Sequence, residues 1–302
     1  MSRFTLLALP LLLSSCEFDG MPSGRFREDF HMNYKLEPGQ RVSVENSNGS
    51  IEVSGWDKNE VDISGERYAP TEDLLRQMKV DVQASSSAVR VRTLKPSRTG
   101  WQGSSGGVKY VIRVPRQTLL DRIESTNGSL RVDDVQGNAL LRSTNGSIKL
   151  YRSQGSYDVL TTNGGIELSV HLGDVKARTT NGGIRVEDLN GSLTAESSNG
   201  AIRARLTGVA VQPLRLETTN GAIEVTAEKQ LAGLQASTSN GTITVRLPAD
   251  LKASVRANGS SVSSDFNIDG DVEKKRIRGK INGGGPLFDI STTNGRIRLE
   301  RL

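Results

Sequence analysis

Residues 123–168 read IESTNGSLRVDDVQGNALLRSTNGSIKLYRSQGSYDVLTTNGGIEL, and this stretch decides the fold. The pair Asn-Gly occurs in it three times, each time eighteen residues after the last. The pair continues along the chain at this spacing or a longer one. The asparagines of the series are Asn127, Asn145, Asn163, Asn181, Asn199, Asn220, Asn240, Asn258 and Asn294. Such a period indicates a repeat architecture in which each repeat is one structural unit.

Apolar and polar residues alternate on both sides of each Asn-Gly pair. In the repeat at Asn145, for example, Leu141 precedes the asparagine and Ile148 and Leu150 follow it. Two positions before eight of these nine asparagines the residue is Ser or Thr, namely Ser125, Ser143, Thr161, Thr179, Ser197, Thr218, Thr238 and Thr292. A period of two predicts β-strands, and the change of parity at Asn-Gly predicts a corner between them.

Asn-Gly between two alternating strands is also typical of a β-hairpin, so a meander or barrel is the rival fold. The repeat favours a solenoid, because identical inward positions in every unit allow like residues to stack on like. We expect glycine to supply a positive φ at the Asn-Gly corner. A second set of glycines predicts a second corner: Gly137, Gly155, Gly173 and Gly191.

We therefore predict an all-β fold, a single-chain parallel β-solenoid (β-helix) with about 18 residues per coil and irregular capping coils. The crossover rule favours a right-handed coil. One irregular copy of the motif, at Asn48, lies in the N-terminal part, where residues 71–79 predict a short helix.

The N-terminus has the pattern of a secretion signal. A short positive region is followed by an apolar run, residues 4–13, that is too short to span a bilayer. Leu13-Ser14-Ser15-Cys16 resembles the lipobox of bacterial lipoproteins, and Cys16 is the only cysteine of the chain. The resemblance implies that Cys16 carries the lipid and that a membrane is a partner. Glu17, in place of aspartate, favours the outer membrane.

The organisation of the chain follows from these signals. It divides into residues 1–15, a signal peptide; 16–30, a lipidated tether; 31–118, irregular N-terminal coils or a cap; 119–246, the regular repeats; and 247–302, irregular coils and a final coil.

The charge of the chain is modest and mixed. It has 39 Lys and Arg against 34 Asp and Glu, a formal net charge of +5, with both signs interspersed. No basic stretch is interleaved with aromatic residues, so we expect no nucleic-acid partner. A single cysteine excludes a disulfide within the chain.

Several segments together resemble a known family. They are Asn48-Gly49-Ser50-Ile51, Gly55-Trp56-Asp57, Tyr110-Val111-Ile112-Arg113-Val114-Pro115 and Ser291-Thr292-Thr293-Asn294-Gly295. With the serial Asn-Gly coils, they are similar to the DUF4097 group, bacterial proteins of unknown function that are proposed to be adhesins. The likeness covers residues 35–302. It implies an envelope or surface protein with a β-helical body and brings no established catalytic residue.

Catalytic and metal-binding motifs are missing from the sequence. His31 lies in the tether region, directly after the segment that ends at residue 30, and His171 takes a repeat position that Val135 and Leu189 fill in other coils. No His, Cys and Asp residues have ligand spacing, so we expect neither a metal nor a cofactor.

The strongest catalytic candidate is a pair of carboxylates. Stacked coils bring equivalent residues about 4.8 Å apart, which would place Glu196 beside Glu217. Repulsion would raise the pKa of one carboxyl, as enzymes that cleave polysaccharides require. A surface ion ladder with Arg178 and Arg215 is the alternative that we favour. A row of exposed hydroxyls one position before each asparagine is best explained by corner hydrogen bonding.

Together these observations favour a lipid-anchored envelope protein, at the outer membrane. It would act as a non-catalytic adhesin-like binding or scaffold module for a glycan, wall polymer or envelope protein. The alternatives are a β-helix polysaccharide lyase or hydrolase and a role in sensing envelope stress.

Overall fold

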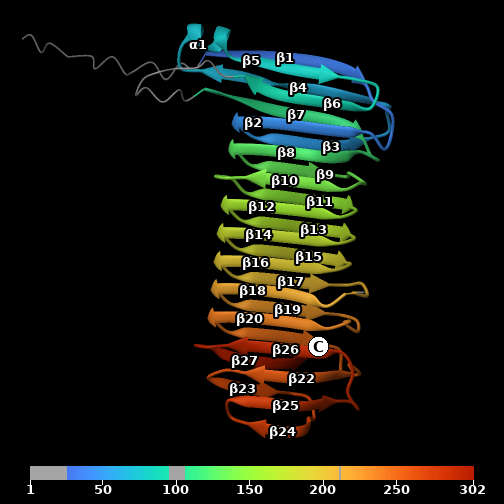
Figure 1. Ribbon diagram of the computed structural model, residues 1–302, viewed down its shortest axis with the longest axis vertical. Coiled ribbons are helices and arrows are strands. Elements are labelled where there is room, and N and C mark those ends of the chain that lie inside the picture. Colours follow the sequence, from blue (N-terminus) through green and yellow to red (C-terminus); the bar gives the residue numbers. More distant parts are fainter. Residues whose placement is uncertain (1–25, 95–105, 211) are drawn as a thin grey trace, which may run out of the picture.

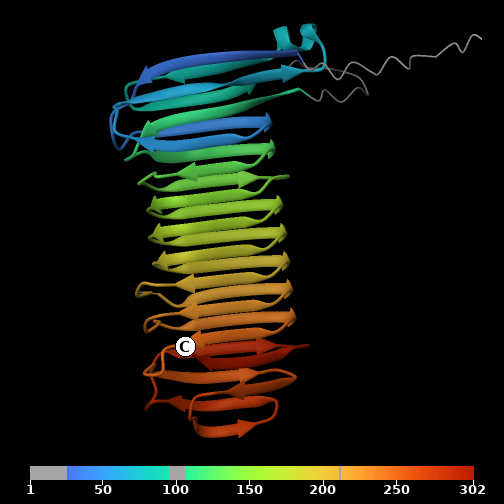
Figure 2. The same ribbon diagram turned by 180° about the vertical axis from the view of Figure 1, so that it is seen from behind.

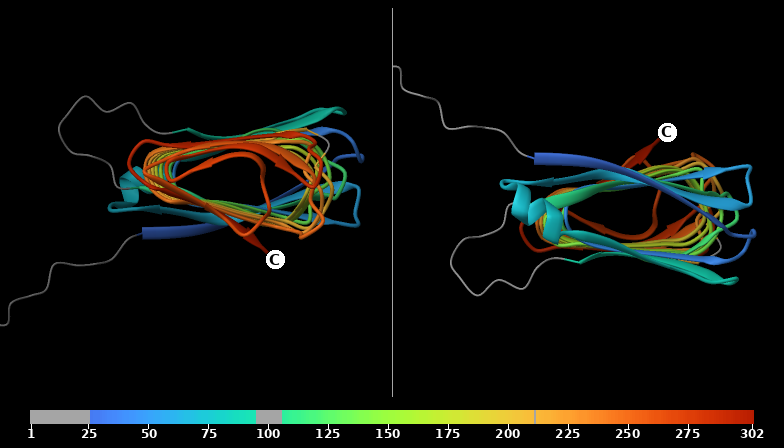
Figure 3. Two further views of the ribbon diagram at one scale, coloured as in Figure 1. Left: turned by 90° about the horizontal axis from the view of Figure 1, so that it is seen from below. Right: turned by 90° about the horizontal axis from the view of Figure 1, so that it is seen from above.

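The computed structural model describes residues 26–94, 106–210 and 212–302. The signal peptide, Cys16 and the start of the tether lie outside these ranges. The described chain winds into one tall stack in which two long sheets face each other (Figure 1; from behind in Figure 2). One sheet has 13 strands and the other has 14. Seen along the stack, the coils overlie one another as a flattened tube (Figure 3). The predicted all-β parallel solenoid is confirmed.

Each regular coil contributes one strand to each sheet. In the 13-stranded sheet these are β3 (Ile51–Trp56), β9 (Leu130–Asp133), β11 (Ile148–Gln154), β13 (Ile166–Leu172), β15 (Ile184–Asn190), β17 (Ile202–Leu206), β19 (Ile223–Ala227), β21 (Ile243–Leu247) and β27 (Arg296–Arg301). In the 14-stranded sheet they are β2 (Arg41–Asn48), β8 (Leu119–Asn127), β10 (Ala139–Ser143), β12 (Tyr157–Asn163), β14 (Val175–Asn181), β16 (Leu193–Asn199), β18 (Leu214–Asn220), β20 (Leu234–Asn240) and β26 (Leu287–Thr292).

Like residues stack on like, as the repeat predicts. Ile148 pairs with Ile166, and Ile166 pairs with Ile184, in parallel register. These isoleucines are no more than 1% exposed, and Leu141 and Val159 of the facing sheet are fully buried. Burial of each such side chain contributes about 1.5–3 kcal/mol, so the aliphatic columns hold the two sheets together.

The Asn-Gly corners carry two ladders of hydrogen bonds. From Asn127 to Asn240, the side-chain amide of each corner asparagine donates to Oδ1 of the asparagine on the preceding coil, as Asn163 does to Asn145 at 2.8 Å. The buried hydroxyl two positions earlier donates to a glycine carbonyl of the preceding coil, as Thr161 does to Gly146 at 2.8 Å. Both ladders repeat because the coils are in register.

The expected positive φ at the Asn-Gly corner is wrong for the regular coils. Among these corner glycines only Gly49 has one, with φ 114°. The others are glycine because the coils approach closely; a Cβ on Gly146 would lie 2.1 Å from the carbonyl oxygen of Gly128. Positive φ occurs instead at the second corner, for example at Gly155 (126°) and at Arg152 (47°) three residues before it.

The N-terminal cap closes the stack with antiparallel strands. They are β1 (Phe26–Lys35), β4 (Glu60–Ala69), β5 (Lys79–Ala84), β6 (Ala88–Leu94) and β7 (Gly107–Pro115). The predicted short helix is confirmed as α1 (Glu72–Gln77), whose first turn is capped by Thr71. The tether predicted to end at residue 30 is wrong in its last five residues, which belong to β1 because Phe30 and Tyr34 pack against the core.

The C-terminal cap departs from sequential stacking. Its strands are β22 (Ala253–Asn258), β23 (Ser261–Ser264), β24 (Asp269–Glu273) and β25 (Arg276–Ile281). The last coil, β26 and β27, lies between these strands and the regular stack. Asn294 therefore donates to Asn240 at 2.9 Å, and Asn258, which the repeat placed next in the series, stays outside the ladder.

Candidate functional surface

The 14-stranded sheet places the predicted carboxylate pair side by side. Glu196 of β16 is the cross-strand partner of Glu217 of β18, with Arg178 on the preceding strand and Ser237 on the next. Asn199 and Asn220, the corner asparagines of these two coils, are more than eighteen residues apart in the sequence. The two strands nevertheless pair in the same register as the other coils. The additional residues fall in the sequence between β17, which ends at Leu206, and β18, which begins at Leu214.

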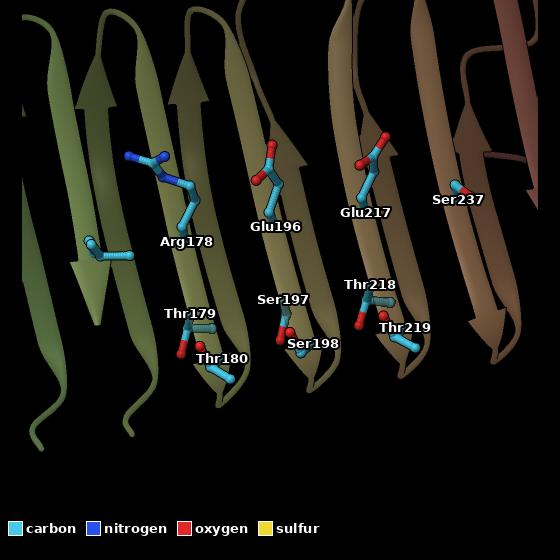
Figure 4. Close-up of a pocket in the computed structure, with 11 residues that line it drawn as sticks. Arg178, Thr179, Thr180, Glu196, Ser197, Ser198, Glu217, Thr218, Thr219 and Ser237 are labelled. Atoms are coloured by element: carbon cyan, nitrogen blue, oxygen red, sulfur yellow. The ribbon is translucent and has the colours of Figure 1, made fainter. Parts of the chain in front are cut away.

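A shallow groove of about 440 Å³ follows this column (Figure 4). The carboxylates of Glu196 and Glu217 project outward from the strands, with the Arg178 side chain on the strand before them. The lower part of the groove presents the exposed hydroxyls of Thr180, Ser198 and Thr219. Thr179, Ser197 and Thr218 also border it, but they are buried and their hydroxyls donate to glycine carbonyls of the hydroxyl ladder. The surface is therefore polar, open and rich in hydrogen-bonding groups.

Of the two glutamates in the groove, one forms an ion pair and the other does not. Glu217 is paired with Arg215 at 2.9 Å, as the ion-ladder hypothesis expects. Arg178 pairs with Asp158 at 3.0 Å and not with Glu196. Among the described residues Glu196 has no ion-pair partner, and Arg178 Nε is buried without a hydrogen-bond acceptor. The groove thus offers carboxylate acceptors to a ligand, whereas Arg178 Nε is shielded from one.

The position of the two carboxylates bears on the chemistry that this groove could support. Glycosidases place two carboxyl groups on either side of the scissile bond. Glu196 and Glu217 project from the same face of one sheet, in adjacent strands (Figure 4). Carboxylates and hydroxyls in a row can instead accept hydrogen bonds from successive sugar hydroxyls.

The two histidines lie far from this groove. His31 is on β1, not in a tether, and is exposed beside Asp62. His171 is 2% exposed; Nδ1 lies 2.8 Å from Ser153 Oγ, and Nε2 lies 3.1 Å from the carbonyl oxygen of Gly155. Burial lowers its pKa to about 4, so the ring is neutral at physiological pH. The interpretation of His171 as a packed corner residue agrees with this environment.

Sequence reasoning missed a second polar hollow. It has a volume of about 510 Å³ and lies where β6 pairs with β2, lined in part by Arg41, Glu45, Arg90 and Arg122. The Arg90 guanidinium, with Arg92, lowers the pKa of Glu45. The parallel pairing of β2 with β6 joins segments that share no repeat motif. Only the alternation of charged residues within each strand could have indicated this hollow from the sequence.

Two further findings concern the described ranges alone. No cluster of three or more His, Cys, Asp or Glu side chains there is arranged to hold a metal ion. None of the helices in those ranges combines the length and apolar character needed to cross a membrane.

Comparisons with known proteins find similar solved structures and a matching family. Among solved structures, a "putative adhesin" from Bacteroides fragilis is 10% identical, with 91% of this chain and 97% of that chain covered and a TM-score of 0.44. One from Parabacteroides distasonis is 9% identical over the same shares, with a TM-score of 0.36. Among curated proteins none matches. The model of the family described as Toastrack DUF4097 matches residues 35–300, and this chain belongs to that family.

Proposed function

We propose that this protein is a lipid-anchored binding module of the cell envelope, adhesin-like and non-catalytic. Its ligand would be a hydroxyl-rich glycan, such as a wall polymer, or the glycan of an envelope protein. The observation that carries this proposal is the open polar groove over β14, β16 and β18, in which Glu196 is left without an ion pair among the described residues. Anchored by Cys16 at the outer membrane, the solenoid would present this face along its length.

The groove is pre-organised for a linear ligand. Its side chains stand on strands held in register by the asparagine and hydroxyl ladders. Equivalent groups recur about every 4.8 Å along the stack, close to the length of one sugar residue. Rigid, evenly spaced acceptors reduce the ordering cost of binding.

Binding can be tested with a steric block inside the groove. Purified envelope glycans would be titrated against the wild type, Ser198→Arg and Thr126→Arg. Both substitutions fall on exposed corner hydroxyls of the same column, but only Ser198 lines the groove. We expect Ser198→Arg to abolish binding and Thr126→Arg to leave it intact. Equal binding by both variants would contradict the proposal.

The stacking of Glu196 on Glu217 also motivates the second candidate, a polysaccharide lyase or hydrolase. Acidic and neutral polysaccharides would be incubated with the wild type and with Glu196→Gln. Turnover that Glu196→Gln removes would support an enzyme; the absence of turnover on every polymer would end that candidate.

The anchor needs its own test. Metabolic labelling with a fatty-acid analogue, followed by membrane fractionation, should label the wild type and find it in the outer membrane. Cys16→Ser should remain unlabelled, and labelling of that variant would rule out Cys16 as the attachment site.

A further inference from the structure

The chain contains twelve Asn-Gly pairs, and the structure divides them into two environments. Nine asparagines form one continuous ladder in which every side-chain amide is hydrogen-bonded to the next, at 2.7–3.0 Å. They are Asn48, Asn127, Asn145, Asn163, Asn181, Asn199, Asn220, Asn240 and Asn294. Three others, Asn190, Asn258 and Asn282, lie outside it.

The three asparagines outside the ladder differ from one another. The amide of Asn282 donates to the carbonyl oxygens of Ala249 and Leu251. The side chains of Asn190 and Asn258 are exposed and make no hydrogen bond within the described ranges. Most ladder asparagines are equally exposed to solvent. Hydrogen bonding, and not access of water, therefore separates the two groups.

Asn-Gly is the dipeptide most prone to deamidation, because glycine leaves its peptide nitrogen unhindered. In this reaction the glycine nitrogen attacks Cγ of asparagine. A C–N bond forms, the bond from Cγ to Nδ2 breaks, and ammonia leaves with the proton of the peptide nitrogen. Water then opens the cyclic imide to aspartate or isoaspartate. The side chain must rotate to bring Cγ to the glycine nitrogen, and a ladder asparagine must first give up its hydrogen bonds.

We propose that Asn190 and Asn258 are the deamidation sites of this protein and that the ladder protects the other exposed Asn-Gly pairs. Each pair has the same reacting atoms, and the hydrogen bonds of the side chain distinguish the two groups. The peptide nitrogen of Gly259 also donates to the carbonyl oxygen of Lys275 at 3.0 Å, and it must leave that bond before it attacks Asn258. A deamidated ladder residue would also be unable to donate to the asparagine of the preceding coil, because a carboxylate has no N–H. Protection of the ladder asparagines from deamidation thus preserves the hydrogen bonds between stacked coils.

The test is a peptide map of the full folded chain after incubation at mildly alkaline pH. Aspartate and isoaspartate would be quantified at every Asn-Gly pair by mass spectrometry, with the denatured chain as reference. We expect Asn190 and Asn258 to react at least about tenfold faster than any ladder asparagine in the folded chain. All pairs should react at similar rates once the chain is unfolded. Ladder sites as fast as Asn190 and Asn258 in the folded chain would overturn the proposal.

A break in the ladder provides an independent test. In Asn163→Ala, Asn181 loses the acceptor of its amide and Asn145 loses the donor to its Oδ1. Deamidation should rise at both neighbours, by about tenfold, and stay slow at Asn240. Circular dichroism would confirm that the variant is folded. Unchanged rates at Asn145 and Asn181 in a folded variant would show that the ladder does not protect them.

Discussion

His171 and Ser153 occupy the same column on adjacent coils, and their side chains meet inside the second corner of the solenoid, with Nδ1 2.8 Å from Oγ. The ring also lies edge-on to Tyr157, with centroids 5.0 Å apart. Since Nε2 faces the carbonyl oxygen of Gly155, it carries the proton and Nδ1 accepts from the serine hydroxyl.

This arrangement predicts a loss of stability in acid. Burial lowers the pKa of His171 to about 4 in the folded chain, against 6.5 for an unperturbed histidine. As pH falls below about 6.5, the unfolded chain takes up the proton first, so stability present above that pH is lost progressively down to about pH 4. The total loss is about 3 kcal/mol.

Denaturant unfolding of the wild type and His171→Leu across this pH range measures the effect. Leucine is chosen because Leu189 stands in the same column on the next coil. The variant should lose the part of the pH dependence that belongs to this residue, whereas His31→Gln on the exposed edge of β1 should keep it. Equal pH slopes in the wild type and His171→Leu would contradict the assignment.

Two neighbouring glycines predict opposite outcomes for the same substitution. A Cβ on Gly164 would lie 2.3 Å from the carbonyl oxygen of Gly146, whereas a Cβ on Gly165 finds its nearest atom at 3.4 Å. Gly164→Ala must force two coils apart, which costs roughly 1–3 kcal/mol. Gly165→Ala should be neutral or stabilise by about 0.4–1 kcal/mol through the unfolded chain. Thermal unfolding of both variants checks this, and a Gly164→Ala variant as stable as the wild type would refute the close-approach explanation.

This pair also shows where sequence reasoning reached its limit. The repeat was enough to predict the corners, because only glycine fits them. A need for positive φ and a need for close approach select the same residue, so the sequence could not separate them. At Gly146 close approach is the cause, because φ is not positive there. At Gly155 both causes hold, since φ is 126° and a Cβ would also lie 2.4 Å from the carbonyl oxygen of Gly137.

The sequence was enough to predict which residues stack in the columns of the regular coils. It was not enough to predict the order of the strands at the two ends of the solenoid. Glu196 stands beside Glu217 because every repeat carries the same inward residues, which fix the register of the outward ones. The pairings of β6 with β2 and of β26 with β20 join segments that differ in motif or lie far apart in the chain. Asn258 keeps the eighteen-residue spacing but loses its place to Asn294, since strand pairing and not spacing decides which coil is stacked.

The buried hydroxyl ladder predicts different effects of the same substitution at two adjacent threonines. Thr161 is fully buried and donates to the carbonyl oxygen of Gly146 at 2.8 Å, whereas Thr162 beside it is exposed. Thr161→Val keeps the shape and removes the donor, so we expect a loss of about 1–3 kcal/mol. Thr162→Val should change stability by less than about 0.5 kcal/mol. Urea midpoints of the two variants provide the measurement, and similar midpoints would mean that the ladder contributes little.

At the second corner, Val170 adopts a left-handed backbone conformation that a β-branched side chain disfavours. Val170 has φ 57° and is 52% exposed. A β-branched side chain is disfavoured in this left-handed region, at a cost of about 1–2 kcal/mol. Val170→Gly should therefore raise the unfolding free energy by about 1 kcal/mol, although glycine also makes the unfolded chain more flexible. Asp188→Gly, at φ 54° in the equivalent position of the next coil, should gain less because aspartate tolerates this conformation. Chemical unfolding of both variants ranks the two gains, and a larger gain at Asp188 would show that the valine is not strained.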